Sequence, residues 1–256
     1  MKKFKNLFTL VAFLMAGAAF TSCVNDDESI IDQPEAQKTY TLMVEATKGA
    51  DTRTLTESEG ALTAAWNKDD EVKVFLGEKE VGTLKPTAAG ATKLKGEVKY
   101  VSEKDELTLK FQSDADYTSQ GGTLDYIDTH CSAAVATVTV DKIVGSDLYT
   151  SDATFLNQQS ITKFTFNVAV KTVNMNDGIN IYTISLDEAS CVIYVALPPS
   201  EEALTYTFKA VDASGVSWVG DAPKKVKLDA GKFYTATITL KEYSMQDYER
   251  QDEQNW

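Results

Sequence analysis

Three cysteines and one histidine are the side chains of this sequence best suited to covalent or metal chemistry: Cys23, Cys131, Cys191 and His130. A single histidine excludes a histidine-rich zinc site. The adjacent His130 and Cys131 would need two further ligands, and neighbouring residues fit one tetrahedral ion poorly. A cysteine–histidine nucleophile would need oxyanion donors and an orienting group that the sequence does not indicate. We therefore predict no metal site, no catalytic residue and no cofactor.

Two pairs of acidic residues, Asp69/Asp70 and Asp114/Asp116, have the residue type of glycosidase carboxylates or calcium ligands. Both pairs lie in turn-like segments, where aspartate is favoured because it hydrogen-bonds the local backbone. The sequence has no G-x-S-x-G, phosphate-binding loop or H-E-x-x-H motif. We expect a protein that is not an enzyme.

The chemistry of Cys23 is set by what precedes it. Three lysines within the first five residues are followed by an apolar run, 7–20, which has the length of a signal-peptide core. Two small residues then lead into Cys23, as in a bacterial lipobox, although Phe20 stands where Leu, Val or Ile is usual. We predict a lipoprotein signal peptide over 1–22 and acylation of the Cys23 thiol. The alternative is a plain secretory leader cleaved near Ala19.

Composition indicates an acidic, exported, globular chain. The 256 residues are 43% hydrophobic, enough to build a core, and carry a net charge of −13. Such a charge argues against nucleic acid or anionic lipid headgroups as partners. Membrane attachment would therefore come from the lipid on Cys23. Cys131 and Cys191 then remain as an even pair, which a disulfide could join; two small buried hydrophobic residues are the alternative.

Hydrophobic residues alternate with a period of two along most of the chain from Tyr40 onward, the spacing of half-buried strands. The segments with this pattern are 40–46, 72–76, 107–111, 164–170, 182–186, 204–208 and 234–240. Turn residues separate them, as in Asn176-Asp177-Gly178, and no long stretch has helical periodicity. Many short strands predict an all-β fold of antiparallel β-sandwiches.

The order of these segments predicts the domain organisation. It consists of a signal peptide (1–22), an acidic tether (23–38), an N-terminal β-sandwich domain (39–158), a C-terminal β-sandwich domain (159–243) and a polar tail (244–256). We place the boundary near Gln158, between the loop-rich segment 118–152 and a run of regularly spaced strands. The acidic residues directly after Cys23 resemble the surface-export signal of Bacteroidetes lipoproteins, which favours the outer face of the outer membrane.

Five segments in this order resemble the fimbrillin family, the fimbrial subunits of Bacteroidetes. They are Thr52-Arg53-Thr54, the stretch 65–75 (AWNKDDEVKVF), the stretch 122–127 (GTLDYI), Ala196-Leu197-Pro198-Pro199 and the stretch 228–235 (LDAGKFYT). The resemblance implies two tandem transthyretin-like β-sandwich domains and a structural role in a pilus.

The resemblance also implies an assembly mechanism. An arginine-specific protease would cut between Arg53 and Thr54 and release the first strand, whose apolar face is Tyr40, Leu42 and Val44. A strand from another fimbrial subunit would then fill the groove by β-strand addition. Arg53 is one of two arginines in the chain and lies in a small, polar stretch that a protease could enter.

A second class of function stays open at this stage. A monomeric surface lipoprotein of the same architecture could bind a glycan or host ligand through Tyr117, Tyr126 or Trp218, although tryptophans beside strands, such as Trp66 and Trp218, are more often core residues. The tail lacks sustained alternation. The position in a fibre, whether stalk, tip or anchor, therefore stays undetermined.

Overall fold

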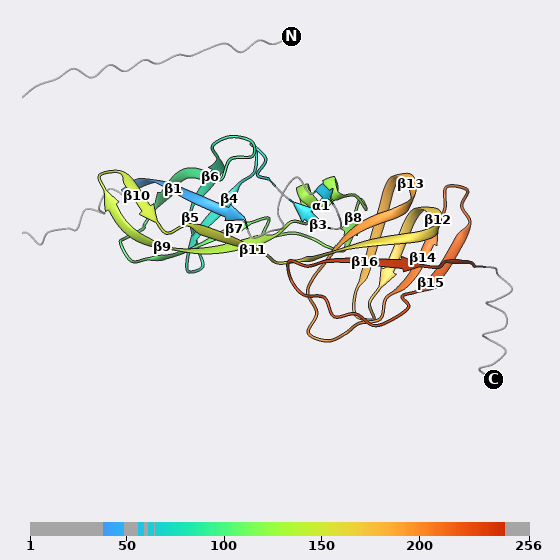
Figure 1. Cartoon of the computed structure of the whole chain (residues 1–256). Helices are drawn as coiled ribbons and strands as arrows, with labels where there is room; N and C mark the ends of the chain where they lie inside the picture. The colour runs from blue at the N-terminus through green and yellow to red at the C-terminus, as the bar shows by residue number, and fades with distance from the viewer. Residues whose placement is uncertain (1–37, 49–55, 59–60, 64, 244–256) are drawn as a thin grey trace, which may run out of the picture. The chain divides into compact units, whose positions relative to one another are not determined.

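The computed structural model describes residues 38–48, 56–58, 61–63 and 65–243, which all belong to one compact unit, Gln37–Trp256. Figure 1 shows this part of the chain as strands with a short helix, α1 (Leu124–His130). The predicted all-β class is confirmed, with sheets arranged as in a sandwich. No helix in the described ranges is long and apolar enough to cross a membrane.

The first sheet has eight strands in which buried and exposed side chains alternate. They are β1 (Thr39–Lys48), β4 (Val72–Leu76), β5 (Lys79–Pro86), β6 (Lys93–Lys99), β7 (Glu106–Phe111), β9 (Ala134–Val144), β10 (Asp147–Thr150) and β11 (Ala153–Asn157). Strands β4 and β7 cover the period-two segments predicted at 72–76 and 107–111. Trp66 is 2% exposed and meets the rings of Phe111 and Phe155 edge-on, so its predicted place in the core is confirmed.

Strand β1 closes the first sheet on itself. Hydrogen-bonded neighbours lead from β6 through β5, β4, β7 and β9 to β10 and β11. Strand β1 pairs antiparallel with β6 from Thr39 to Glu45, and parallel with β10 and β11 on its other side. It therefore covers the backbone edges that these strands would otherwise leave open.

Two glycines allow β5 and β6 to approach closely. A Cβ atom added to Gly96 would lie 1.9 Å from the carbonyl oxygen of Thr83, and one on Gly82 would lie 2.1 Å from that of Glu97. Any side chain at either position would push the two backbones apart, so the pairing beside β1 requires glycine.

The second sheet is built around a long hairpin. Its strands are β8 (Ser119–Gln120), β12 (Ser160–Asn176), β13 (Ile181–Leu197), β14 (Thr207–Val211), β15 (Ser217–Asp221), β16 (Phe233–Ile238) and β17 (Lys241–Glu242). The first part of β12 lies beside β16 and the last part beside β14. The ladder between β12 and β13 shifts register between Thr165 and Val170, where the strand passes from one neighbour to the other.

Asn167 lies within this register shift and binds the backbone just beyond β16, the neighbour of β12 on its other side. Its Nδ2 donates to the carbonyl oxygen of Leu240 at 3.0 Å, and the Leu240 N–H donates to its Oδ1 at 2.7 Å. Leu240 is buried, so these two bonds satisfy backbone groups that water does not reach.

The turn between β12 and β13 is organised by a buried carboxylate. Asp177 is 6% exposed and accepts the N–H groups of Ile179 and Asn180 and the hydroxyl of Tyr182. Burial alone would raise the pKa of Asp177, but these hydrogen bonds outweigh it and hold the pKa below the ordinary value. Gly178 follows with a φ of +91°, as the predicted Asn-Asp-Gly turn requires.

The prediction that 118–152 is loop-rich is wrong. It contains α1, the 11-residue strand β9 and β10. The inward positions at the start of β9 are Ala134 and Ala136, whose small side chains weaken the apolar alternation on which the prediction relied.

Between β1 and β4 lies a small ribbon, β2 (Thr56–Ser58) paired with β3 (Ala61–Thr63). Leu62 of β3 is buried in a cluster with Ile127, Cys131, Ile161 and Ala196. This cluster joins the ribbon and α1 to β12 and β13 of the second sheet.

Sheet membership changes close to the predicted boundary. Strand β11 ends the first sheet at Asn157 and β12 begins the second at Ser160, but β8, at 119–120, already belongs to the second sheet. The division into domains 39–158 and 159–243 stays a prediction.

Candidate functional site

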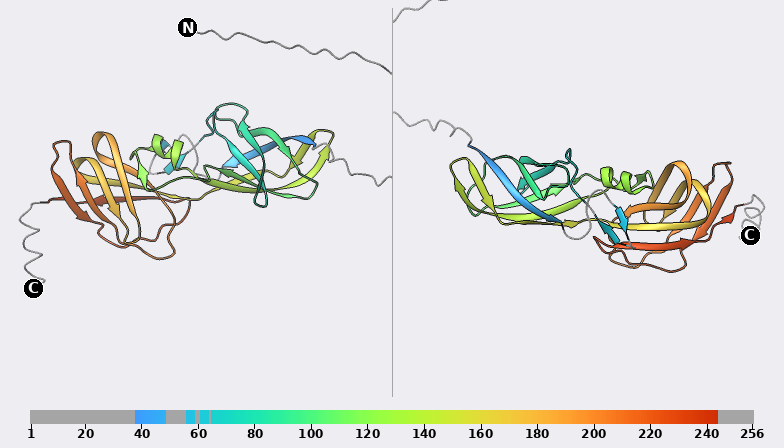
Figure 2. Two further views of the ribbon diagram at one scale, coloured as in Figure 1. Left: turned by 180° about the vertical axis from the view of Figure 1, so that it is seen from behind. Right: turned by 45° about the horizontal axis from the view of Figure 1, so that its top comes forward.

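The candidate functional site is the space that β1 fills between β6 on one side and β10 and β11 on the other, called the β1 groove below. Figure 2 shows β1 in blue among the strands of the first sheet. The predicted face of this strand lies in the core: Leu42 is 0% and Val44 1% exposed, and Tyr40 is half-buried against the same cluster. Ala46, the last inward position of the predicted segment 40–46, is also buried.

The walls of the β1 groove come from residues paired with β1. On β6, Leu94 lies opposite Val44, Gly96 opposite Leu42 and Val98 opposite Tyr40. On the other side, Leu148 of β10 lies beside Leu42, and Ala153 of β11 lies beside Ala46. Leu94, Val98, Leu148 and Ala153 are all at most 2% exposed, so loss of β1 would bring a continuous apolar surface into contact with water.

The outward face of β1 is polar and partly paired. The carboxylate of Glu45 accepts the Thr92 hydroxyl and lies 3.8 Å from the Nζ of Lys93. Met43 points outward and is 47% exposed. The two faces of β1 thus differ: an apolar one in the core and a solvated one beside the lysines of β6.

The predicted processing residues lie outside the described residues. Cys23, Arg53 and Thr54 fall there, as does the tail after residue 243. The described chain ends after Lys48 of β1 and resumes at Thr56 of β2. The predicted cut therefore falls between a strand of the first sheet and the ribbon.

The ribbon is held to the second sheet by a charged contact that the sequence analysis did not find. Both carboxylate oxygens of Glu57 accept from Lys163, at 2.9 and 2.8 Å, and one also accepts the hydroxyl of Tyr194. The hydrogen bond from Lys163, and then that from Tyr194, lowers the pKa of Glu57. No sequence signal links these residues, because 106 and 137 positions separate Glu57 from its partners. A cut after Arg53 would leave this attachment intact.

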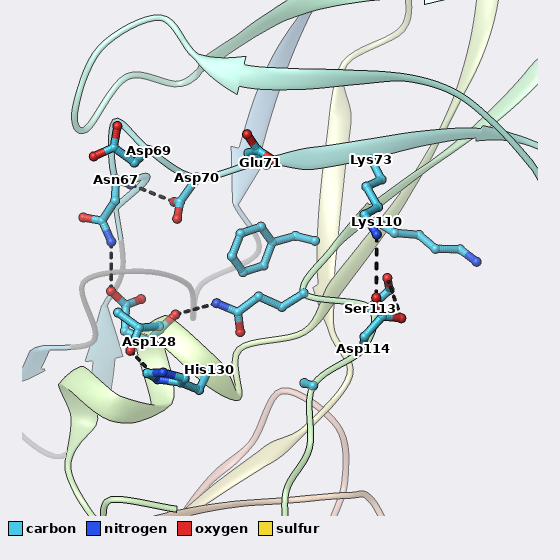
Figure 3. Close-up of a pocket in the computed structure, with 14 residues that line it drawn as sticks. Asn67, Asp69, Asp70, Glu71, Lys73, Lys110, Ser113, Asp114, Asp128 and His130 are labelled. Carbon is cyan, nitrogen blue, oxygen red and sulfur yellow. Dashed lines mark hydrogen bonds and ion pairs between the residues drawn. The ribbon is translucent and has the colours of Figure 1, made fainter. Parts of the chain in front are cut away.

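An open pocket of about 680 Å³ lies between α1 and the start of β4 (Figure 3). Inside it, Asn67 donates from Nδ2 to Asp128 at 3.0 Å, and its N–H donates to Asp70 at 2.8 Å. Asp114 lies 3.6 Å from Lys73. These contacts organise a turn and the rim of the pocket, as expected for aspartates in turns.

Among the residues that the structure describes, no group of three or more His, Cys, Asp or Glu side chains could hold a metal ion. Asp116 accepts both the N–H and the hydroxyl of Thr118, which lowers the pKa of its carboxyl. One member of each acidic pair, Asp70 or Asp116, thus accepts a nearby backbone N–H, whereas Asp114 lies beside Lys73.

Cys131 and Cys191 are both free in the structure. Cys131 is buried below α1, where burial, and then the charge of Asp116, raises the pKa of its thiol to about 12. Cys191 is exposed on β13. The disulfide that the sequence allowed is not formed, and a buried thiol with such a high pKa is a poor nucleophile.

The aromatic residues considered for glycan binding make contacts within the chain. Tyr126 stacks on His130 and donates to the carbonyl of Ser119. Trp218 donates its indole N–H to Asp212, and Tyr117 packs against two core clusters. All three side chains are half-buried.

No family model and no curated protein sequence matches the chain. Solved structures that it resembles have low sequence identity. A candidate cell adhesion protein from Bacteroides uniformis has a TM-score of 0.44 and 8% identity, over 82% of this chain and 98% of that one. The tip fimbrial protein Mfa3 from Porphyromonas gingivalis has 0.39 and 8%, over 80% and 98%. A fimbrial protein from Bacteroides ovatus has 0.42 and 8%, over 79% and 49%.

Proposed function

We propose that the chain is a structural, non-catalytic subunit of a cell-surface fimbria or adhesin, assembled by exchange of its first strand. It is exported as a lipoprotein acylated on Cys23 and reaches the outer face of the outer membrane. Its two tandem domains are transthyretin-like sandwiches. Its partners are other fimbrial subunits and an arginine-specific protease that cuts between Arg53 and Thr54. The solved structures that the chain resembles include fimbrial and cell adhesion proteins.

The observation that carries this proposal is the place of β1 in the first sheet. Strand β1 pairs on both sides and carries Leu42, Val44 and Ala46 into the core, yet it is the first described strand and precedes the predicted cut. Its removal would leave two open backbone edges and an apolar groove, which together favour addition of another strand.

The contacts of the ribbon would allow β1 to leave without the chain that follows it. Glu57, Lys163 and Tyr194 hold the ribbon that follows the cut, and Leu62 anchors it in a buried cluster. The new N-terminus would stay attached to the second sheet while β1 leaves.

Substitution of Arg53 tests the proposal. Wild-type protein treated with an arginine-specific protease should lose the residues up to Arg53 and form ladders that resist mild heating in detergent. Arg53→Ala should keep its first strand and stay monomeric. Mass spectrometry and gel electrophoresis measure both results.

Arg250→Ala is the matched control, because residue 250 is the other arginine of the chain. It should be cut after Arg53 and assemble like the wild type. Ladders formed equally well by Arg53→Ala would contradict the proposal. A protein that stays monomeric after the cut, with tryptophan fluorescence quenched by a sugar, would favour the glycan-binding alternative.

A further inference from the structure

We propose that the β1 groove selects a strand with acidic residues on its outward face, in addition to the apolar residues of its inward face. The partner is an extended segment. At the inward positions that Leu42, Val44 and Ala46 occupy in β1, it carries a large aliphatic, a branched and a small residue. At the outward positions between them it carries acidic residues. The inference rests on the strand exchange proposed above and specifies which strand is accepted.

The inward face sets the order of sizes. At the Leu42 position the partner on β6 is Gly96, which has no side chain, so a large aliphatic residue fits there. At the Ala46 position the neighbour is Ala153, itself 0% exposed, in a close-packed part of the core. A shift of one residue would turn the apolar side chains outward, so this pattern fixes the register of any incoming strand.

The outward face of β6 is basic opposite the second half of β1. Residues directly opposite on paired strands have side chains on the same face, so Lys93 lies opposite Glu45 and Lys95 opposite Met43. Toward the start of β1 the charges are mixed, with Lys99 opposite Thr39, and Glu97 of β6 and Asp147 of β10 on either side of Thr41. All three lysines are exposed. In a chain with a net charge of −13, the adjacent outward lysines Lys93 and Lys95 are a local exception that favours acidic residues at the two positions opposite them.

Strand β1 forms an ion pair with only one of the two lysines opposite Met43 and Glu45. Glu45 pairs with Lys93, but Lys95 faces Met43 and has no ion pair within the described ranges. A strand with acidic residues opposite both lysines would gain a contact that β1 lacks. Such a strand would compete with β1 for the groove once the chain is cut.

The test uses the full-length chain with the recognition sequence of an unrelated site-specific protease placed between Arg53 and Thr54. After cutting, fluorescent peptides covering residues 38–48 are added in excess, and their uptake is followed by fluorescence anisotropy and native mass spectrometry. The reference peptide has the natural sequence, and the variants carry Met43→Glu, Met43→Lys or Leu42→Ala.

Met43→Glu should bind about two- to fivefold more tightly than the reference and Met43→Lys more weakly by a similar factor, as expected for an exposed ion pair. Both differences should disappear in about 1 M salt because the Debye length is then only about 3 Å. Leu42→Ala should weaken binding about 30-fold or more at any salt concentration, because it removes buried apolar surface.

Charge reversal in the protein completes the test. Lys95→Glu should invert the preference, so that Met43→Lys becomes the tighter peptide. Lys209→Glu, an exposed lysine on β14 of the second sheet, is the matched control and should leave the preference unchanged.

The outcomes separate the two proposals. If no peptide enters the cut protein, strand exchange itself is wrong. If peptides enter but Met43→Glu and Met43→Lys bind equally, or if Lys95→Glu does not invert their order, the groove does not read the outward face and this inference is overturned.

Discussion

In the first sheet, the strand that closes the sheet lies far along the chain from the strands with which it pairs. The central pair of the second sheet, β12 and β13, are consecutive strands. Strand β1 closes the first sheet by pairing with β6, β10 and β11, whose residues lie between about 50 and 110 positions later. Strands β12 and β13 are joined by a short turn and pair along most of their 17 residues.

The two sheets therefore differ in whether a single cut in the chain could release one of their strands. Strand β1 precedes all the other strands that the structure describes. A single cut after it would therefore leave only non-covalent contacts between β1 and the rest of the first sheet. Strands β12 and β13 each contact several neighbours and continue into the rest of the sheet. Under the proposed strand exchange, the first sheet would lose and regain one strand while the second stays intact.

The largest expected effect is in the second sheet. Phe208→Ala should lower the free energy of unfolding by about 3–5 kcal/mol because it removes a buried ring. That ring meets Phe164 and Phe166 edge-on at 5.1 and 5.8 Å between centroids. Urea unfolding measures the loss. Val211→Ala on the same strand, 37% exposed, should change stability by less than about 0.5 kcal/mol. An equal loss in both variants would show that the buried Phe208 ring contributes no more to stability than an exposed side chain of the same strand.

Leu42→Ala tests the first sheet. It should cost about 2–5 kcal/mol, since Leu42 is fully buried, and should increase amide hydrogen exchange in β6 and β10 more than in β12. Met43→Ala, on the outward face of the same strand, is the control with little expected change. Uniform acceleration across both sheets would mean that β1 does not open separately.

Asn167→Ala should destabilise the second sheet by about 1–3 kcal/mol, because it leaves the buried N–H and carbonyl of Leu240 without their partners. Hydrogen exchange at Leu240 should rise with it. Asn174→Ala, at an exposed position of the same strand, serves as the comparison. Unchanged protection at Leu240 would refute the role of this side chain in the register shift.

Asp177→Asn should have the smallest effect, about 1 kcal/mol near neutral pH, since the amide oxygen can still accept part of the hydrogen bonds. The pKa of Asp177 is below its ordinary value in the folded chain. Its stabilisation is therefore complete above the unfolded pKa of about 4, and is lost as pH falls through the folded pKa.

The difference between parent and Asp177→Asn should accordingly vanish toward about pH 2, as followed by urea unfolding at a series of pH values. Asp187→Asn, exposed on β13, should show no such trend. A difference that stays constant with pH would mean that the Asp177 carboxylate does not stabilise the turn through its charge.

The sequence predicted the strands whose alternation uses large side chains. The segments 72–76 and 107–111 correspond closely to β4 and β7, and Asn176-Asp177-Gly178 forms the predicted turn. Strand β9 was missed because Ala134 and Ala136 give a weak apolar signal. The inward face of β1 was predicted by the alternation within 40–46, and its residues Leu42, Val44 and Ala46 are buried.

The amino-acid sequence by itself determined the all-β class and which side of β1 is apolar, because both follow from a local period of two. Only the tertiary structure decided that β1 closes its sheet, that lysines of β6 line its outward side, and that Glu57 meets Lys163 and Tyr194. These are pairings between residues far apart in the chain. Local periodicity carries no information about which strand lies beside which, since that choice depends on packing of the whole core.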